Sequence, residues 1–156
     1  MTSDGGSPAS ELPRIDEHRV AIAAEPAAVW DALLATLGES FSGRAPTAYA
    51  RLIRGRPARA SGPRPLAAGS EVPGFRVVRA EPANALELEG RHLFSRYALR
   101  FRLDPQGTTT ELAAESLAEF PGPHGRAYRL LVISTRGHVV GVRRLLAAVR
   151  RRAEKH

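Results

Sequence analysis

Five polar side chains of this sequence have the types and positions that acid–base chemistry in an apolar pocket would need. Strand alternation and helical periodicity place all of them on inward-facing sides of their elements: His18, Tyr97, Ser116, Thr135 and His138. A tyrosine and a histidine on one apolar wall could polarise a carbonyl group and move a proton, as an aldol-type cyclisation or a dehydration requires. Ser116 lies outside any Gly-x-Ser-x-Gly motif, so it is not predicted to be a nucleophile.

Two of these side chains also have an ordinary structural interpretation. A half-buried tyrosine on a strand commonly satisfies its hydroxyl group with a nearby partner. A histidine on an apolar helix face is commonly a hydrogen-bonded core residue. The sequence therefore leaves open whether Tyr97 and His138 contact a ligand or only stabilise the core.

The sequence contains no motif for metal binding, for thiol chemistry or for a phosphate-binding loop. The five histidines, at positions 18, 92, 124, 138 and 156, form no His-x-x-x-His pair and have no acidic cluster beside them. The absence of cysteine excludes disulfides and thiolate chemistry and favours the cytoplasm as the compartment. We expect no metal and no other cofactor.

The basic charge of the chain is concentrated in two segments. The formal net charge is +7, and arginines gather in residues 41–70 and 143–156. Aromatic residues that would stack on bases are not interleaved with these arginines, so we predict no nucleic-acid binding. No apolar run approaches the roughly 18 residues that span a bilayer, so we expect no stable membrane insertion.

A tail, a strand and a helix are predicted for the first forty residues. Residues 1–12 are small and polar, which is typical of a disordered tail. Residues 14–24 alternate as a half-buried strand does, with His18 on the apolar face. A helix then begins near Pro26, which suits a first turn, and ends near Gly38.

The middle of the chain combines a long loop with several strands. Residues 38–74 are rich in glycine and proline, which predicts a loop with one short helix at 47–55. A loop of this length commonly serves a binding site, and we expect residues 40–70 to border a cavity entrance. Strands are predicted over 74–81, 84–91, 92–103 and 108–120. Pairing of the last two would set an arginine row beside a glutamate row on the solvent face.

A long amphipathic helix is predicted over residues 124–152. At 100° per residue, one set of side chains faces the core and another faces solvent. The buried set is Leu131, Val142, Leu145 and Val149, and the exposed set is Arg129, Arg136 and Arg143. His138 lies at the centre of the buried face, next to Gly137, although glycine costs a helix about 1 kcal/mol relative to alanine.

The order of these elements, together with "IAAEPAAVWDAL" at 22–33, resembles the START-like helix-grip superfamily (SRPBCC; the polyketide cyclase/dehydrase and lipid-transport group). The resemblance implies an α+β fold in which a curved antiparallel sheet of about six strands grips a long C-terminal helix. It also implies one ligand-binding domain, residues 13–156, with a cavity for hydrophobic molecules. Small and polar residues at the middle of the long helix would shape the cavity wall.

Three classes of function follow from this resemblance. The first is binding of a lipid- or polyketide-like molecule in the cavity, by a monomer or homodimer. The second is a cyclase or dehydratase that uses the same cavity, and the third is a non-enzymatic protein that binds a partner through its arginine-rich surfaces. For the first two, the predicted ligand-binding residues are His18, Tyr97, Leu99, Ser116, Tyr128, Leu131, Thr135 and His138.

Overall fold

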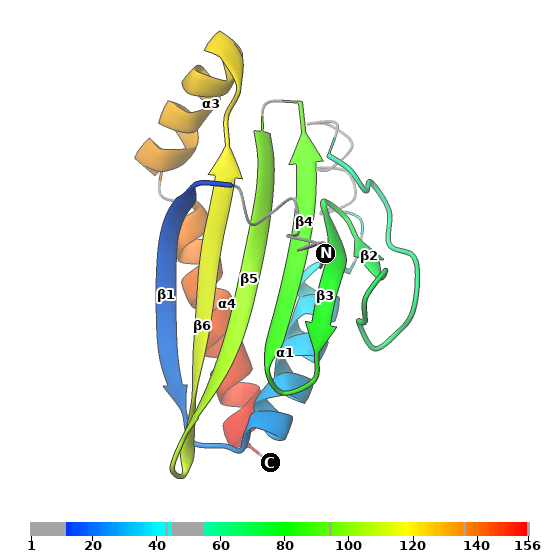
Figure 1. Cartoon of the computed structure of the whole chain (residues 1–156), viewed down its shortest axis with the longest axis vertical. Helices are drawn as coiled ribbons and strands as arrows, with labels where there is room; N and C mark the ends of the chain where they lie inside the picture. Colours follow the sequence, from blue (N-terminus) through cyan, green and yellow to red (C-terminus); the bar gives the residue numbers. More distant parts are fainter. Residues whose placement is uncertain (1–11, 43, 45–54, 94, 136, 156) are drawn as a thin grey trace, which may run out of the picture.

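The computed structural model describes residues 12–42, 44, 55–93, 95–135 and 137–155, with the side chains of 131–135 and 137 excepted. Its elements follow one another as drawn in Figure 1: β1 (Arg14–Ile22), α1 (Pro26–Ser40), β2 (Glu71–Val72), β3 (Phe75–Glu81), β4 (Ala85–His92), β5 (Ser95–Gln106), β6 (Thr109–Glu119), α3 (Gly122–Thr135) and α4 (Gly137–Glu154). The strands form one antiparallel six-stranded sheet in the order β1-β6-β5-β4-β3-β2.

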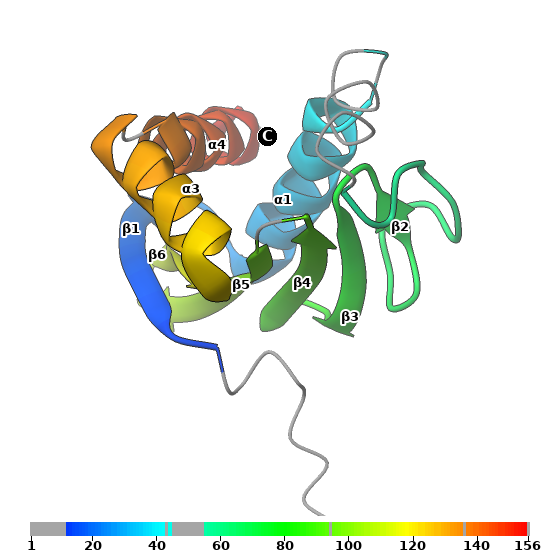
Figure 2. The ribbon, with the colours of Figure 1, turned by 90° about the horizontal axis from the view of Figure 1, so that it is seen from above.

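Helices α1 and α4 lie side by side on one face of this sheet, and the sheet curves around them (Figure 2). We call this the concave face and the opposite one the convex face. The main core lies between the concave face and the two helices, and its fully buried members include Val29, Leu33, Phe101 and Val149. The predicted α+β architecture, a curved antiparallel sheet against helices, is confirmed.

The predicted single helix over 124–152 is wrong in one respect, because the structure contains two helices there. Helix α3 ends at Thr135 and α4 begins at Gly137, and the two axes point in different directions (Figure 2). The local sequence provides the physical reason. Thr135 is β-branched and Gly137 loses much backbone entropy in a helix, so neither residue favours its continuation.

The faces of α4 nevertheless follow the predicted periodicity. Among the residues expected to be buried, Val149 is fully buried and Val142 and Leu145 are partly buried. Arg129 and Arg143 are exposed, as expected. The side chains of Leu131 and Arg136 lie outside the described part. At the other end of the chain, Leu12, expected in the tail, is buried against Ala98 and Leu117, while residues 1–11 lie outside the description.

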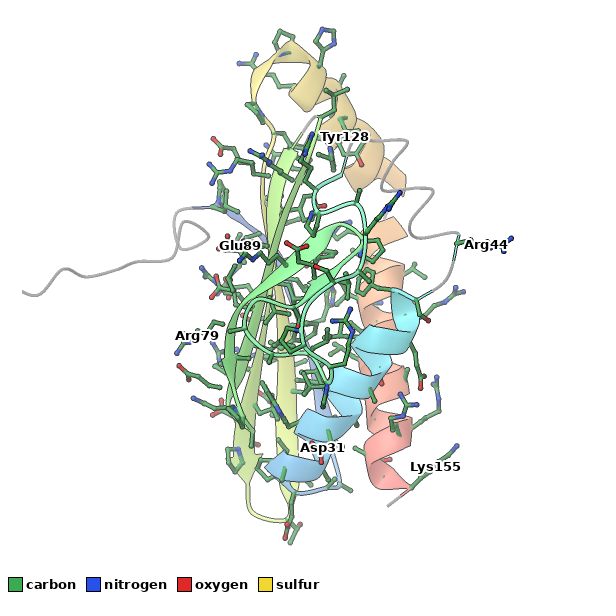
Figure 3. All side chains as sticks on the ribbon, turned by 90° about the vertical axis from the view of Figure 1, so that its right-hand side faces the viewer. Asp31, Arg44, Arg79, Glu89, Tyr128 and Lys155 are labelled. Carbon is green, nitrogen blue, oxygen red and sulfur yellow. The ribbon has the colours of Figure 1, made fainter. Side chains whose placement is uncertain are left out.

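Strand alternation separates apolar from charged side chains on the sheet. Leu99, Phe101 and Leu103 of β5 are buried, whereas Arg96 and Arg102 are exposed. The register confirms part of the predicted charge row, since Arg96 pairs with Glu119 and Arg100 with Glu115. Figure 3 shows Arg79 of β3 on the convex side, away from α1 and α4.

A close contact between β4, β5 and the turn before β3 depends on a glycine. The Tyr97 hydroxyl donates a hydrogen bond to the Gly74 carbonyl oxygen at 2.7 Å, and the Tyr97 ring lies over Gly90. A Cβ atom on residue 90 would lie 1.9 Å from the Gly74 oxygen and 2.5 Å from the Tyr97 ring. Only glycine lets these backbone and side-chain atoms meet.

We therefore expect Gly90→Ala to destabilise the fold by about 1–3 kcal/mol, as overpacking does. Gly38→Ala is the matched control, because a Cβ there meets no atom within 4 Å and alanine favours the α1 helix. Urea unfolding of both variants tests this expectation. Equal stability of the two variants would show that the Tyr97–Gly74 contact does not constrain residue 90.

Candidate ligand-binding site

A cavity of about 220 Å³ lies between the concave face of the sheet and helices α3 and α4. Its wall is mostly apolar and aromatic, and every strand except β2 contributes to it along with the two helices. The lining residues are Ile15, Phe75, His92, Ser95, Tyr97, Ala98, Leu99, Ser116, Leu117, Ala118, Phe120, Tyr128, His138 and Val142.

The predicted site residues fall into three groups in the structure. Five of them line the cavity: Tyr97, Leu99, Ser116, Tyr128 and His138. His18 does not line it, and its side chain instead contacts Asp16 on the same strand. The side chains of Leu131 and Thr135 lie outside the described part of the structure. Contact of any of these residues with a ligand stays a prediction.

Aromatic rings form the wall of the cavity near α3. His92 packs edge-on against Tyr128, with ring centroids 4.8 Å apart, and also lies beside Tyr97 at 5.5 Å. Phe75 packs on the other side of Tyr97 at 5.1 Å, and Phe120 lies beside Tyr128. The Tyr97 hydroxyl is bonded to the Gly74 carbonyl oxygen, which satisfies its donor within the protein, while its ring lines the cavity.

His92 is a cavity residue that the sequence analysis missed. Its Nε2 atom is 2.9 Å from Ser95 Oγ, and burial lowers the pKa of His92 below its usual value. The sequence pattern predicts that residue 92 begins the following strand, whereas it is the last residue of β4. Because alternation reverses with a one-residue shift, that boundary error turned His92 to the wrong face.

A second polar group at the cavity is built by β1 and α4. His138 Nε2 lies 2.8 Å from Asp16 Oδ2, and His18 Nε2 lies 3.4 Å from the same oxygen. Asp16 has the same strand parity as His18, so alternation could have identified it. In the described part of the chain, no group of three His, Asp or Glu side chains is arranged to hold a metal ion.

The two ring nitrogens of His138 have different surroundings. Nε2 is bonded to Asp16, which agrees with a hydrogen-bonded core histidine. Nδ1 is buried and has no hydrogen-bond partner among the described residues, although the ring lines the cavity. Asp16 Oδ1 is buried and unpaired in the same way. Buried polar atoms in this state point to a ligand or a water molecule as the missing partner.

The expected position of residues 40–70 at the cavity entrance finds no support in the described part of this segment. None of its described residues lines the cavity. Gly55 to Ala58 and Gly69 line a groove on the convex face instead, beside the last residues of β4. Backbone hydrogen bonds between Arg56 and Arg91 hold the segment against β4 at this position. The short helix expected at 47–55 falls mostly outside the described residues.

Several solved structures have a similar fold. TTHA0849 from Thermus thermophilus aligns with a TM-score of 0.55 at 17% identity, over 90% of this chain and 97% of that one. CalU16 from Micromonospora echinospora aligns with a TM-score of 0.52 at 16% identity, over 92% of both chains. DynU16, a protein in the dynemicin biosynthetic locus, aligns with a TM-score of 0.52 at 17% identity, over 84% of this chain and 45% of that one.

These similarities show that the chain has a helix-grip fold. The sequence itself matches no family model and no curated protein. None of the described helices combines the length and the apolar character that crossing a membrane requires.

The lowered pKa of His92 makes stability depend on pH in a specific direction. Because the folded pKa lies below the usual 6.5, the unfolded chain takes up the proton more readily. Stability is therefore lost as the pH falls from about 6.5 through the folded pKa. We expect His92→Gln to lose less stability than the wild type between pH 7.5 and 5, measured by urea unfolding.

His124→Gln is the matched control for this experiment. His124 is exposed in α3, so its variant should follow the wild-type pH profile. A His92→Gln profile parallel to that of the wild type would contradict the expected contribution of His92.

Proposed function

We propose that this chain binds a hydrophobic small molecule, lipid- or polyketide-like, in the cavity between the sheet and helices α3 and α4. The observation that carries the proposal is a mostly apolar and aromatic wall that includes His138, whose Nδ1 atom is buried without a hydrogen-bond partner among the described residues. Apolar surroundings with a few convergent polar groups are typical of small-molecule sites. The helix-grip fold supports the proposal.

The volume of the cavity limits the size of the ligand. An engineered cavity of about 150 Å³ accommodates benzene, so about 220 Å³ suits one or two fused rings or a short acyl segment. Drug-sized ligands occupy cavities of about 300–1,000 Å³. The bound part of the molecule is therefore smaller than a whole lipid.

The Asp16–His138 pair gives this ligand a preferred polar group. When neutral His138 donates from Nε2 to the Asp16 carboxylate, its Nδ1 atom carries the lone pair and accepts a hydrogen bond. A ligand hydroxyl group satisfies this acceptor, whereas a carbonyl oxygen does not. In this protonation state we infer a ligand that carries a hydroxyl group near one end.

A second candidate function is catalysis of a cyclisation or dehydration in the same cavity. The same pair favours it, because a carboxylate that orients one imidazole nitrogen leaves the other available as a general base. Turnover of a hydroxylated or carbonyl-bearing substrate, lost in His138→Gln, would distinguish this function from binding alone. The third class, a partner-binding protein that uses its arginine-rich surfaces, predicts a small or filled cavity and therefore no dye binding in the experiment below.

Filling the cavity should abolish binding of a neutral apolar dye. We expect Ser116→Leu to weaken binding of naphthalene, a fluorescent two-ring dye, by at least tenfold, because the larger side chain occupies the cavity. Thr108→Leu, at the exposed turn between β5 and β6, is the control and should bind as the wild type does. Dye fluorescence measures both. Unchanged binding by a folded Ser116→Leu variant would contradict the proposed location.

The role of His138 can be tested with a pair of ligands that differ by one hydroxyl group. We expect His138→Leu to weaken binding of 2-naphthol by about 0.5–1.5 kcal/mol, the net value of one hydrogen bond, and to leave naphthalene binding unchanged. Calorimetry below the melting temperature of the variant measures both. Lower thermal stability with an unchanged preference between the ligands would identify His138 as a core residue only.

A further inference from the structure

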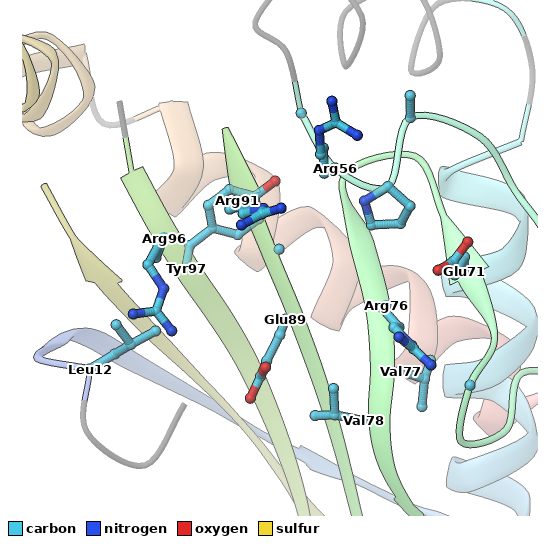
Figure 4. A pocket seen from close by; sticks show the side chains of 15 residues that line it. Leu12, Arg56, Glu71, Arg76, Val77, Val78, Glu89, Arg91, Arg96 and Tyr97 are labelled. Atoms are coloured by element: carbon cyan, nitrogen blue, oxygen red, sulfur yellow. The ribbon is translucent and has the colours of Figure 1, made fainter. Parts of the chain in front are cut away.

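A second and larger depression lies on the opposite side of the sheet, between the ends of β3, β4 and β5 and the segment around Arg56 (Figure 4). It is an open groove of about 1210 Å³. Its charged lining residues are Arg56, Arg76, Arg91, Arg96, Glu71 and Glu89, so arginines outnumber acids. The hydrophobic cavity shares only Tyr97 with it.

Three of these arginines are neighbours across adjacent backbone segments. Arg91 of β4 pairs with Arg96 of β5 on one side and with Arg56 on the other. We call these three residues the arginine ladder. Adjacent strands lie about 4.8 Å apart, so the ladder spreads three guanidinium groups over about 10 Å of backbone. Like charges in directly opposed positions destabilise a sheet.

Another row of residues across the convex face has alternating charges. There, Arg79, Glu87, Arg100 and Glu115 alternate in sign across β3, β4, β5 and β6. Arg100 forms an ion pair with Glu87 at 3.3 Å. Alternation of this kind stabilises the sheet. The three arginines of the ladder, which are neighbours across adjacent segments, are an exception, because sheet stability does not explain their like charges.

The acids near the ladder do not neutralise it. Arg76 pairs in register with both Glu71 and Glu89, and these two acids set against the four arginines of the groove leave a net positive charge. Arg96 has Glu119 at 4.0 Å, with both side chains at least half exposed. Within the described part of the chain, neither Arg56 nor Arg91 forms an ion pair, and both are exposed. The ladder therefore carries uncompensated positive charge.

We propose that the arginine ladder binds a ligand with two or more linked phosphate groups. Planar guanidinium groups bind phosphate oxygens through paired hydrogen bonds, and neighbouring arginines on adjacent strands reach successive groups of one ligand. A bound phosphate ligand would offset the repulsion among the three arginines, which destabilises the free protein. This site is separate from the hydrophobic cavity and does not depend on the function proposed above.

Calorimetric titration with inorganic tripolyphosphate at low salt tests the proposal. We expect saturable binding that weakens at least tenfold in the Arg91→Gln/Arg96→Gln variant and weakens with added salt. Arg102→Gln is the matched control, because Arg102 is exposed on the same face of β5 but lies opposite Ala85 and Ala113. The control should bind within twofold of the wild type.

Further measurements distinguish the source of the phosphate groups and detect misfolding. The double variant should melt at or above the wild-type temperature, because it removes like-charge repulsion. Binding to vesicles containing phosphatidylinositol bisphosphate, lost in the double variant, would identify a lipid headgroup; tripolyphosphate binding without vesicle binding would identify a free ligand. Absence of binding to both probes, or equal loss in Arg102→Gln, would overturn the proposal.

Discussion

Alternation of side chains along β5 and β6 is the constraint on which the rest of the structure depends. Residues two apart share a face of a strand, so Leu99, Phe101 and Leu103 point toward the helices while Arg96, Arg100 and Arg102 point to the convex side. One face of the sheet is mostly apolar, and this face packs against α1 and α4. The same alternation places the hydrophobic cavity and the arginine ladder on opposite sides of one layer.

The cavity exists because α3 and α4 do not form one straight helix against the sheet. Helix α4 packs closely on β1 and α1, where Leu146, Val149 and Ala153 are buried. Near its first turn the packing opens, and aromatic side chains from the strands and α3 surround the space that remains. Residues of low helix propensity at the junction of α3 and α4 thus separate the closely packed part of the molecule from the part that contains the cavity.

The polar chemistry of the cavity depends on a pairing between distant parts of the chain. Asp16 and His138 are 122 residues apart in sequence, yet their side chains meet at 2.8 Å. Asp16 bonds to one imidazole nitrogen, and the other, Nδ1, is buried without a partner among the described residues in a ring that lines the mostly apolar cavity. In apolar surroundings a hydrogen bond to a ligand is worth more than in water, and an unmade one costs more. One partly buried pair can therefore select among ligands of similar shape.

Local periodicity by itself determined much of this protein. Strand alternation and helical periodicity identified the long strands, α1, the buried face of α4 and five residues of the cavity wall, because these signals depend only on near neighbours. The family resemblance implied that the strands form one curved sheet. Tertiary structure decided what depends on strand ends and distant contacts. His92 faces the cavity because β4 ends after it, Asp16 meets His138 through packing of α4 on β1, and Arg56 joins the ladder through its pairing with Arg91. No local pattern encodes these partners, since each pairing forms only when segments far apart in the chain fold against each other.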